Sequence, residues 1–257
     1  MIGRHCWIIV AVLMAGCAEQ KNATVSPYRN AEDMMDSSQA ESEVPVADGL
    51  SNERKPFGQE LAPVYNQREA EAAIKALGGR HRSASDRLSL ADSRITDSEM
   101  KLLQWFTNAY EIDLSRTHIT DAGLVHIKGL TELRRLVLSH THVTDAGLVH
   151  LRPLTHLNRL NLSHTRITDT GLEHLKGLTN LRSVYLTGTQ ITDAGLADLS
   201  GLLRLSELDL AETSITDGGL KHLKGLSNLT RLHLQGTQIT QAGLGELKEA
   251  LPDCSID

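Results

Sequence analysis

Hydrophobic positions recur every 24 residues over the C-terminal two thirds of the chain. A hexapeptide of the form Ile-Thr-Asp-Ala-Gly-Leu fills residues 119–124 and returns with small changes at 143–148, 167–172, 191–196, 215–220 and 239–244, and a degenerate copy lies at 95–100. Because alternate residues of a strand point to one face, the apolar pairs upstream of each copy predict short strands with two inward side chains. These pairs are Leu88/Leu90, Ile112/Leu114, Leu136/Leu138, Leu160/Leu162, Val184/Leu186, Leu208/Leu210 and Leu232/Leu234.

The second half of each unit predicts a short helix and a return to the next strand. The Asp of each hexapeptide, as in Asp121, stands where the helix begins and is expected to cap it. Helices should end near Gly129, Pro153, Gly177, Gly201 and Gly225. Glycine recurs in the first turn, as in Gly123, although it costs about 1 kcal/mol relative to alanine there. That recurrence indicates a close approach between stacked coils.

These positions match the signature L-x-x-L-x-L-x-x-N-x-L, in which one unit supplies Ala109, Ile112, Leu114, Thr117 and Ile119. The chain therefore resembles the leucine-rich repeats, in particular the 24-residue bacterial class. The resemblance implies an α/β solenoid: a horseshoe of about seven repeats with a short parallel concave sheet and short convex helices. Where that family has Asn, this chain has Ser93 and then Thr at each unit. We expect these hydroxyls to satisfy backbone carbonyls with fewer bonds and looser turns.

The N-terminal region carries an export signal. Arg4 precedes an apolar stretch that is too short to span a bilayer, which predicts a signal peptide over residues 1–17. Residues 13–17 resemble a bacterial lipobox that ends at Cys17, with Met14 in place of the usual Leu. The resemblance implies lipidation at Cys17 and an exported, membrane-anchored lipoprotein of the bacterial cell envelope. Cleavage after Gly16 or Ala18, which would give a secreted soluble protein, is the alternative.

Between the signal and the repeats, the sequence predicts a tether and a cap. Residues 18–63 are polar, with several prolines and no apolar period, and are expected to form a disordered polar tether. Residues 64–86 are expected to form an N-terminal helical cap whose amphipathic helix spans 66–77. The repeat domain then covers 87–257, and Cys254 and Ile256 suggest a final short strand with a buried structural thiol.

Composition and charge remove several classes of function. The chain of 257 residues is 40% apolar but only 3% aromatic, which fits many similar thin layers rather than a core around large rings. A net charge of -6 lacks the basic excess typical of nucleic-acid binders, so no nucleic acid is expected. The three cysteines allow no disulfide framework. No phosphate loop, Cys-x-x-Cys, H-E-x-x-H or G-x-S-x-G motif occurs, so neither an enzyme nor a cofactor is predicted.

The candidate binding site is the outward face of the strands, where the units differ most. Strand alternation places two variable columns there. Tyr185 is the one aromatic residue of these columns, and Tyr and Arg often anchor interfaces. We therefore expect a monomer that binds a protein partner through this face. The predicted site residues are Glu111, Asp113, Arg135, Val137, Arg159, Asn161, Tyr185, Glu207, Asp209, Arg231 and His233, and Arg87, Ser89 and Ser183 complete the columns.

Three alternatives to a protein-binding face remain. The face could be solvated and have no single partner, or the chain could be a structural or glycan-contacting envelope protein. A metal-responsive surface protein is the third, because imidazoles one coil apart could bind a transition metal. Duplication of one ancestral unit explains these histidines more simply, so no metal site is assigned. The histidines concerned are His126, His150, His174 and His222 on the predicted helices and His118, His140, His142 and His164 in the turns.

Overall fold

The computed structural model describes residues 66–257 of the chain. The predicted signal peptide with Cys17, the tether of residues 18–63 and the first two residues of the predicted cap lie outside the described residues. Within residues 66–257, no helix is both long enough and apolar enough to cross a bilayer.

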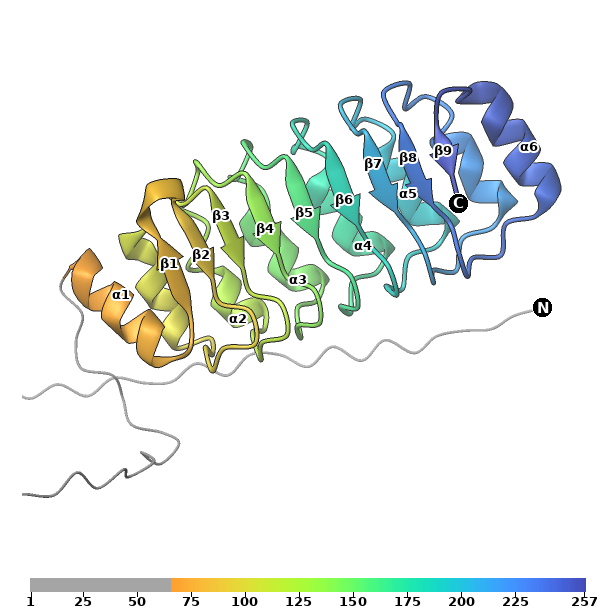
Figure 1. Cartoon of the computed structure of the whole chain (residues 1–257). Coiled ribbons are helices and arrows are strands. Elements are labelled where there is room, and N and C mark those ends of the chain that lie inside the picture. The colour runs from red at the N-terminus through yellow and green to blue at the C-terminus, as the bar shows by residue number, and fades with distance from the viewer. Residues whose placement is uncertain (1–65) are drawn as a thin grey trace, which may run out of the picture. The chain divides into compact units, whose positions relative to one another are not determined.

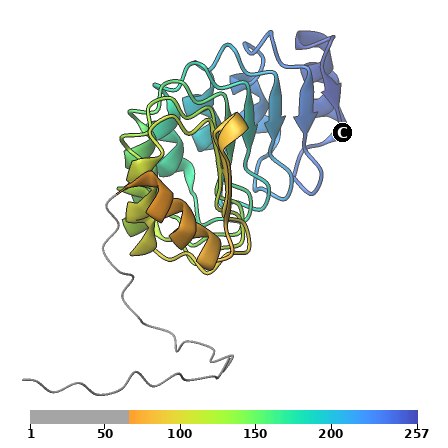
Figure 2. The same cartoon turned by 60° about the vertical axis from the view of Figure 1, so that its left-hand side comes forward.

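One nine-stranded sheet runs through the described part, with the strands in chain order. Figures 1 and 2 show this sheet along one side of the solenoid and the helices along the other. The strands from β2 onward are parallel, which confirms the predicted α/β solenoid. The strands are β1 (Arg80–Arg82), β2 (Arg87–Ser89), β3 (Glu111–Asp113), β4 (Arg135–Val137), β5 (Arg159–Asn161), β6 (Ser183–Tyr185), β7 (Glu207–Asp209), β8 (Arg231–His233) and β9 (Ser255–Ile256).

Each end of the sheet carries elements that are not part of a full 24-residue repeat. The predicted helix over residues 66–77 is present as α1 (Gln67–Ala76), with Asn66 as its N-cap, and it buries Ala70 and Ile74. Strand β1, which pairs antiparallel with β2, was not predicted. Its sequence, Arg-His-Arg, has no apolar alternation, so only the pairing with β2 identifies it. At the other end, β9 is the short final strand expected around Ile256, and Cys254 is buried beside it as predicted.

The helical side is shorter and tighter than the sequence predicted. Three of the α-helices are single turns that end at the hexapeptide Leu, about five residues before the expected glycine or proline. A 3-10 helix rises about 2.0 Å per residue against 1.5 Å for an α-helix, so it crosses the coil with fewer residues. The α-helices are α2 (Asp121–Leu124), α3 (Asp145–Leu148), α4 (Asp169–Leu172), α5 (Asp193–Leu199) and α6 (Gln241–Ala250); the 3-10 helices are η1 (Ser83–Ser85), η2 (Glu99–Trp105), η3 (Val149–Leu151), η4 (Glu173–Leu175) and η5 (Asp217–His222).

The core is a stack of aliphatic layers, one from each coil. In the coil that contains β3, Ile112, Leu114, Ile119 and Leu124 are fully buried, and the next coils repeat this set. Each such side chain contributes about 1.5 to 3 kcal/mol when it leaves water. No coil can bury these residues alone, since each coil packs against its neighbours.

The aspartates of the hexapeptides link neighbouring coils, so the prediction that they cap their own helices is wrong. The N-cap of α3 is Thr144, and Asp145 is the first helical residue. The Asp145 carboxylate accepts hydrogen bonds from the backbone N of Thr168 (2.8 Å) and from its Oγ1 (2.6 Å), one coil ahead. This pair of bonds, here called the Asp latch, also joins Asp97 to Thr120, Asp121 to Thr144, Asp169 to Thr192, Asp193 to Thr216 and Asp217 to Thr240.

The recurring glycines make room for the Asp latch, which confirms the predicted close approach. A Cβ on Gly123 would stand 2.5 Å from Oδ1 of Asp97, and one on Gly219 would stand 2.5 Å from Oδ1 of Asp193. Real Cβ atoms do not approach an oxygen this closely. Because each glycine has no Cβ, the Asp carboxylate of the preceding coil can lie directly against the helix that contains the glycine.

The threonines in the family's Asn position act inside their own coil. Thr117 Oγ1 donates to the carbonyl of Leu114 at 2.6 Å, and the same bond recurs at Thr141, Thr165, Thr189, Thr213 and Thr237. These hydroxyls satisfy backbone carbonyls as expected. The bonds between coils that an Asn could have supplied come instead from side chains ahead of the strands, such as Asn180 to the carbonyl of Thr155 (2.9 Å) and Asn228 to that of Leu203 (2.7 Å).

The Asp latch should be a measurable part of the stability. Replacing Asp145 by Ala leaves the donors of Thr168 and Thr170 without their charged acceptor. We expect D145A to lower the free energy of unfolding in urea by about 2 to 4 kcal/mol. Glu173, exposed on the helical side, supplies the control, and E173A should change stability by less than about 0.5 kcal/mol. Equal effects of the two variants would contradict an inter-coil role for Asp145.

The glycine positions allow a second, paired test. A Cβ on Gly171 would collide with Oδ1 of Asp145, whereas one on Gly177 would meet no atom within 4 Å. We expect G171A to lower the free energy of unfolding by about 1 to 3 kcal/mol through overpacking. G177A should be close to neutral. A stabilised G171A, as helix propensity alone would give, would show that the carboxylate moves aside at little cost.

Candidate functional site

The sheet places the predicted site residues in two outward columns. In each strand from β2 to β8 the middle side chain is buried, so the first and third residues point away from the core. The register aligns the first residues, from Arg87 through Glu111, Arg135, Arg159, Ser183 and Glu207 to Arg231. It aligns the third residues, from Ser89 through Asp113, Val137, Asn161, Tyr185 and Asp209 to His233. We call this surface the sheet face.

Two arginines share one acid at the N-terminal part of the sheet face. Oε2 of Glu111 lies 3.2 Å from Nε of Arg87 and 3.6 Å from Nη1 of Arg135. The Arg135 guanidinium also lies 5.7 Å from the centre of the Tyr110 ring. The sequence reasoning missed Tyr110 because it stands one residue before the outward column. Its position directly ahead of a predicted strand was the available signal.

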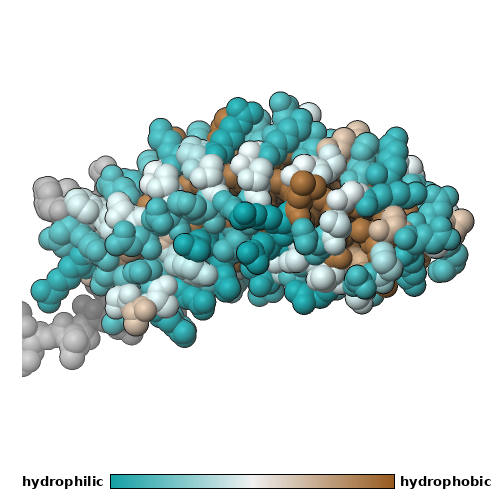
Figure 3. All heavy atoms as spheres, turned by 90° about the horizontal axis from the view of Figure 1, so that it is seen from above, coloured by the Kyte–Doolittle hydropathy of each residue, from teal (hydrophilic) through white to brown (hydrophobic). Residues whose placement is uncertain are grey.

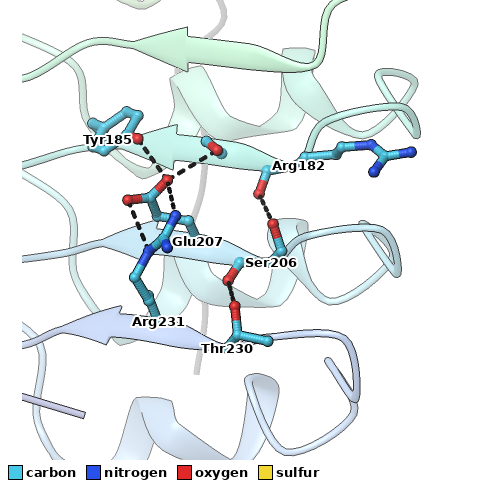
Figure 4. A network of polar contacts seen from close by, with 7 residues as sticks. Arg182, Tyr185, Ser206, Glu207, Thr230 and Arg231 are labelled. Atoms are coloured by element: carbon cyan, nitrogen blue, oxygen red, sulfur yellow. Dashed lines mark hydrogen bonds and ion pairs between the residues drawn. The ribbon is translucent and has the colours of Figure 1, made fainter. Parts of the chain in front are cut away.

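Glu207 is the centre of a polar cluster in the C-terminal part. Tyr185 Oη donates to Oε2 of Glu207 at 2.7 Å, and Ser183 Oγ donates to the same oxygen at 3.1 Å. Arg231 binds both carboxylate oxygens, with Nε 3.2 Å from Oε1 and Nη2 3.0 Å from Oε2. Figure 4 shows Tyr185, Glu207 and Arg231 reaching toward one another from β6, β7 and β8. The cluster joins three consecutive coils on the outer side of the sheet.

The cluster changes the acidity of its members. Burial alone would raise the pKa of Glu207, but hydrogen bonds from Arg231, Tyr185 and Ser183 outweigh it and lower the pKa to about 2. Burial, together with the hydrogen bond to Glu207, raises the pKa of Tyr185. Glu207 therefore stays ionised, and the Tyr185 hydroxyl keeps its proton as the donor. The sequence identified Glu207 and Tyr185 as surface residues but could not show that they bind each other.

Several third-column residues are engaged with the backbone. Oδ1 of Asp113 accepts from the N and Oγ of Ser115 (3.0 and 2.6 Å). Asn161 and Asp209 accept in the same way from the backbone two residues later, at 2.9 and 3.0 Å. His233 Nδ1 lies 2.8 Å from Oδ1 of Asp257. These side chains already have partners within the protein, so fewer of their polar atoms are available to a ligand.

Arg159 is the exception in the middle of the sheet face. Its guanidinium lies 4.8 Å from the centre of the Tyr185 ring, in cation–π range. Among the arginines of the described strands β2 to β8, it alone has no carboxylate within ion-pair distance. Arg159 and Tyr185 thus present a flat cationic and aromatic surface whose charge is not balanced by a neighbouring side chain.

The turn histidines stack rather than converge. The rings of His140 and His164 lie 4.4 Å apart at 20°, and those of His118 and His142 lie 5.8 Å apart at 25°. Parallel rings do not aim their nitrogen lone pairs at one point. Over residues 66–257, no group of three or more His, Cys, Asp or Glu side chains is placed to hold a metal ion.

The Glu207 cluster generates a pH prediction. The ordinary Glu pKa is about 4.3, so with a native pKa of about 2 the carboxylate adds stability above pH 4.3 that is lost as the pH falls toward 2. We expect E207Q to be about 2 to 3 kcal/mol less stable than the wild type at neutral pH. The gap should shrink when urea unfolding is measured near the native pKa. E173Q serves as the exposed control. A gap that stays constant with pH would contradict the role given to the Glu207 charge.

Comparisons with known proteins agree with this architecture. A leucine rich repeat family model matches residues 131–191, and a second leucine rich repeat model matches residues 225–248. No curated protein sequence matches the chain. Among solved structures, the chain is similar to an internalin C2 from Listeria monocytogenes, with 24% identity and a TM-score of 0.50; the match covers 73% of this chain and 92% of the internalin. The chain therefore carries leucine-rich repeats and has the leucine-rich-repeat solenoid fold.

Proposed function

We propose that this chain is an envelope-anchored interaction module that binds a protein partner through its sheet face. The observation that carries the proposal is the Arg159–Tyr185 pair, a cation stacked on an aromatic ring with no carboxylate to neutralise it. Tyr and Arg are over-represented among the residues that dominate binding energy at protein interfaces. The eight parallel strands, about 4.8 Å apart, span roughly 34 Å, which is enough for a modest protein interface.

We further propose that the protein is exported, attached to a membrane and monomeric. The lipobox-like residues 13–17 support export and attachment to a membrane through acyl chains on Cys17; secretion as a soluble protein is the runner-up. The repeat domain acts as a monomer, and we assign it a binding role and no reaction. A negative net charge argues against nucleic acid as the partner.

A structural or glycan-contacting role in the envelope is the second candidate. This role is supported by the polar residues of the third column. Asp113 and Asn161, for example, already accept hydrogen bonds from their own backbone, and they make much of the sheet face polar. A metal-responsive role for the histidine pairs has less support, since their rings stack in parallel.

Photo-crosslinking at two matched valines tests the proposal. Val137 points outward on β4, whereas Val149 is 39% exposed on the helical side. With a benzophenone amino acid at either position in the native cell, we expect discrete protein adducts from position 137 and none from 149. Adding R159A, which removes no ion pair from the sheet face, should reduce the adduct about tenfold, in line with the loss of an interface anchor, at a nearly unchanged melting temperature.

The outcomes separate the candidates. Adducts of equal yield from both positions would overturn binding through the sheet face. Adducts from position 137 that a cell-wall hydrolase removes and a protease leaves intact would favour the glycan-contacting role.

A further inference from the structure

Charge alternates along the sheet face in blocks of strands. Strand β3 carries Glu111 and Asp113, and strand β7 carries Glu207 and Asp209. Between them, β4 to β6 carry Arg135 and Arg159 and no acidic residue. We call Arg135 and Arg159 the central basic pair. The acids of the sheet face thus lie on both sides of a basic middle, and Arg87 and Arg231 lie beyond them on β2 and β8.

The flanking acids do not neutralise the central basic pair. Glu207 is bound on both oxygens by Arg231, on the side away from the middle, and also accepts from Tyr185. Glu111 lies closer to Arg87 than to Arg135, at 3.2 against 3.6 Å. Arg135 therefore has a shared acid at most, and Arg159 has none. The two arginines are register partners on adjacent strands, where like charges destabilise a sheet. An external anion placed over the pair would relieve that repulsion.

The same pattern argues against a uniformly charged ligand. A polyanion that extends along the sheet face would meet Glu111 and Asp113 on one side and Glu207 and Asp209 on the other. Like charges that face each other across an interface weaken binding by up to several kcal/mol. A nucleic acid strand, an acidic polysaccharide or an anionic bilayer surface carries this uniform charge. A protein segment can instead change its charge from one residue to the next.

We infer that the sheet face selects a protein segment with a carboxylate over Arg159, next to Arg135, and basic groups over β3 and β7. The inference rests on the proposed function and names its partner chemistry. Two strand spacings separate β5 from β3 and from β7, so the basic groups lie about 10 Å from the carboxylate on each side. On a helix that follows the sheet, this distance corresponds to about seven residues. The partly buried ring of Tyr185 and the side chain of Val137 supply apolar contact beside the carboxylate.

Designed peptides test the inference on the full-length chain. The matched probe is a fluorescent, alanine-based helix of about 15 residues with Lys near both ends and Glu at its middle. The reversed probe exchanges the Lys and Glu positions, and the third probe has Glu at all three. By fluorescence anisotropy, we expect the matched probe to bind about fivefold more tightly than either of the others, as one favourable charge pair allows.

A charge exchange in the protein sharpens the test. R159E should invert the preference, so that the reversed probe binds more tightly than the matched probe. R166E makes the same charge change on the turn between β5 and α4 and should keep the original preference. Inversion by R159E alone supports the inference. Equal binding of all three probes overturns it, as does tightest binding of the all-Glu probe or of phosphatidylglycerol vesicles.

The failure of this inference is distinguishable from that of the proposed function. If the probes show no preference while position 137 still forms protein adducts in the cell, the sheet face binds a partner of another chemistry. If those adducts are absent as well, the sheet face is not a protein-binding surface.

Discussion

The Asp latch is the interaction on which the regular stacking of this solenoid depends. Each carboxylate receives two hydrogen bonds from the threonine that begins the next helix, at 2.6 to 2.9 Å along the whole array. Charge-assisted hydrogen bonds are about twice as strong as neutral ones. The latch holds the helical side of one coil against the next, while the strands hold the other side. The stacking distance is thereby set at both sides of every coil.

The latch explains why the hexapeptide is so uniform. Thr168 must offer both a backbone N–H and a hydroxyl, Asp145 must face it, and Gly171 must leave space for the carboxylate. Each requirement links residues of two different coils, so a change in one unit disturbs its neighbour. The first and third residues of the strands face no such constraint, since their side chains point away from the core. Variation therefore concentrates on the sheet face, where no residue has to fit a carboxylate of the neighbouring coil.

On the sheet face itself, contacts between strands decide which charges remain available. Arg159 and Arg231 occupy equivalent positions three coils apart, yet their environments differ. Arg231 neighbours Glu207 and binds it through two nitrogens, whereas Arg159 lies beside Ser183 and stacks on Tyr185. A residue that repeats in sequence is thus paired with an acid in one coil and left without one in another. The charge pattern of the surface comes from these differences between coils.

The sequence by itself determined the repeat, the positions of strands β2 to β9 and the two outward columns. It could do so because a 24-residue period and alternation of buried side chains are local properties of the chain. Even the close approach at the glycines was readable, since Gly123 recurs where helix propensity disfavours it. The predicted tether and lipid anchor lie outside the described residues and stay predictions.

The tertiary structure alone decided the contacts between coils. Asp145 looked like a cap for its own helix, and only stacking showed that its partner is Thr168, 23 residues ahead. Strand β1 has no apolar pattern and exists because β2 offers it an edge. The balance of Glu207 between Tyr185 and Arg231, and the absence of such an acid at Arg159, also depend on which side chains meet across strands. The physical reason is the same in each case: the period and the alternation of apolar residues do not reveal which groups come within hydrogen-bond distance once the chain is folded.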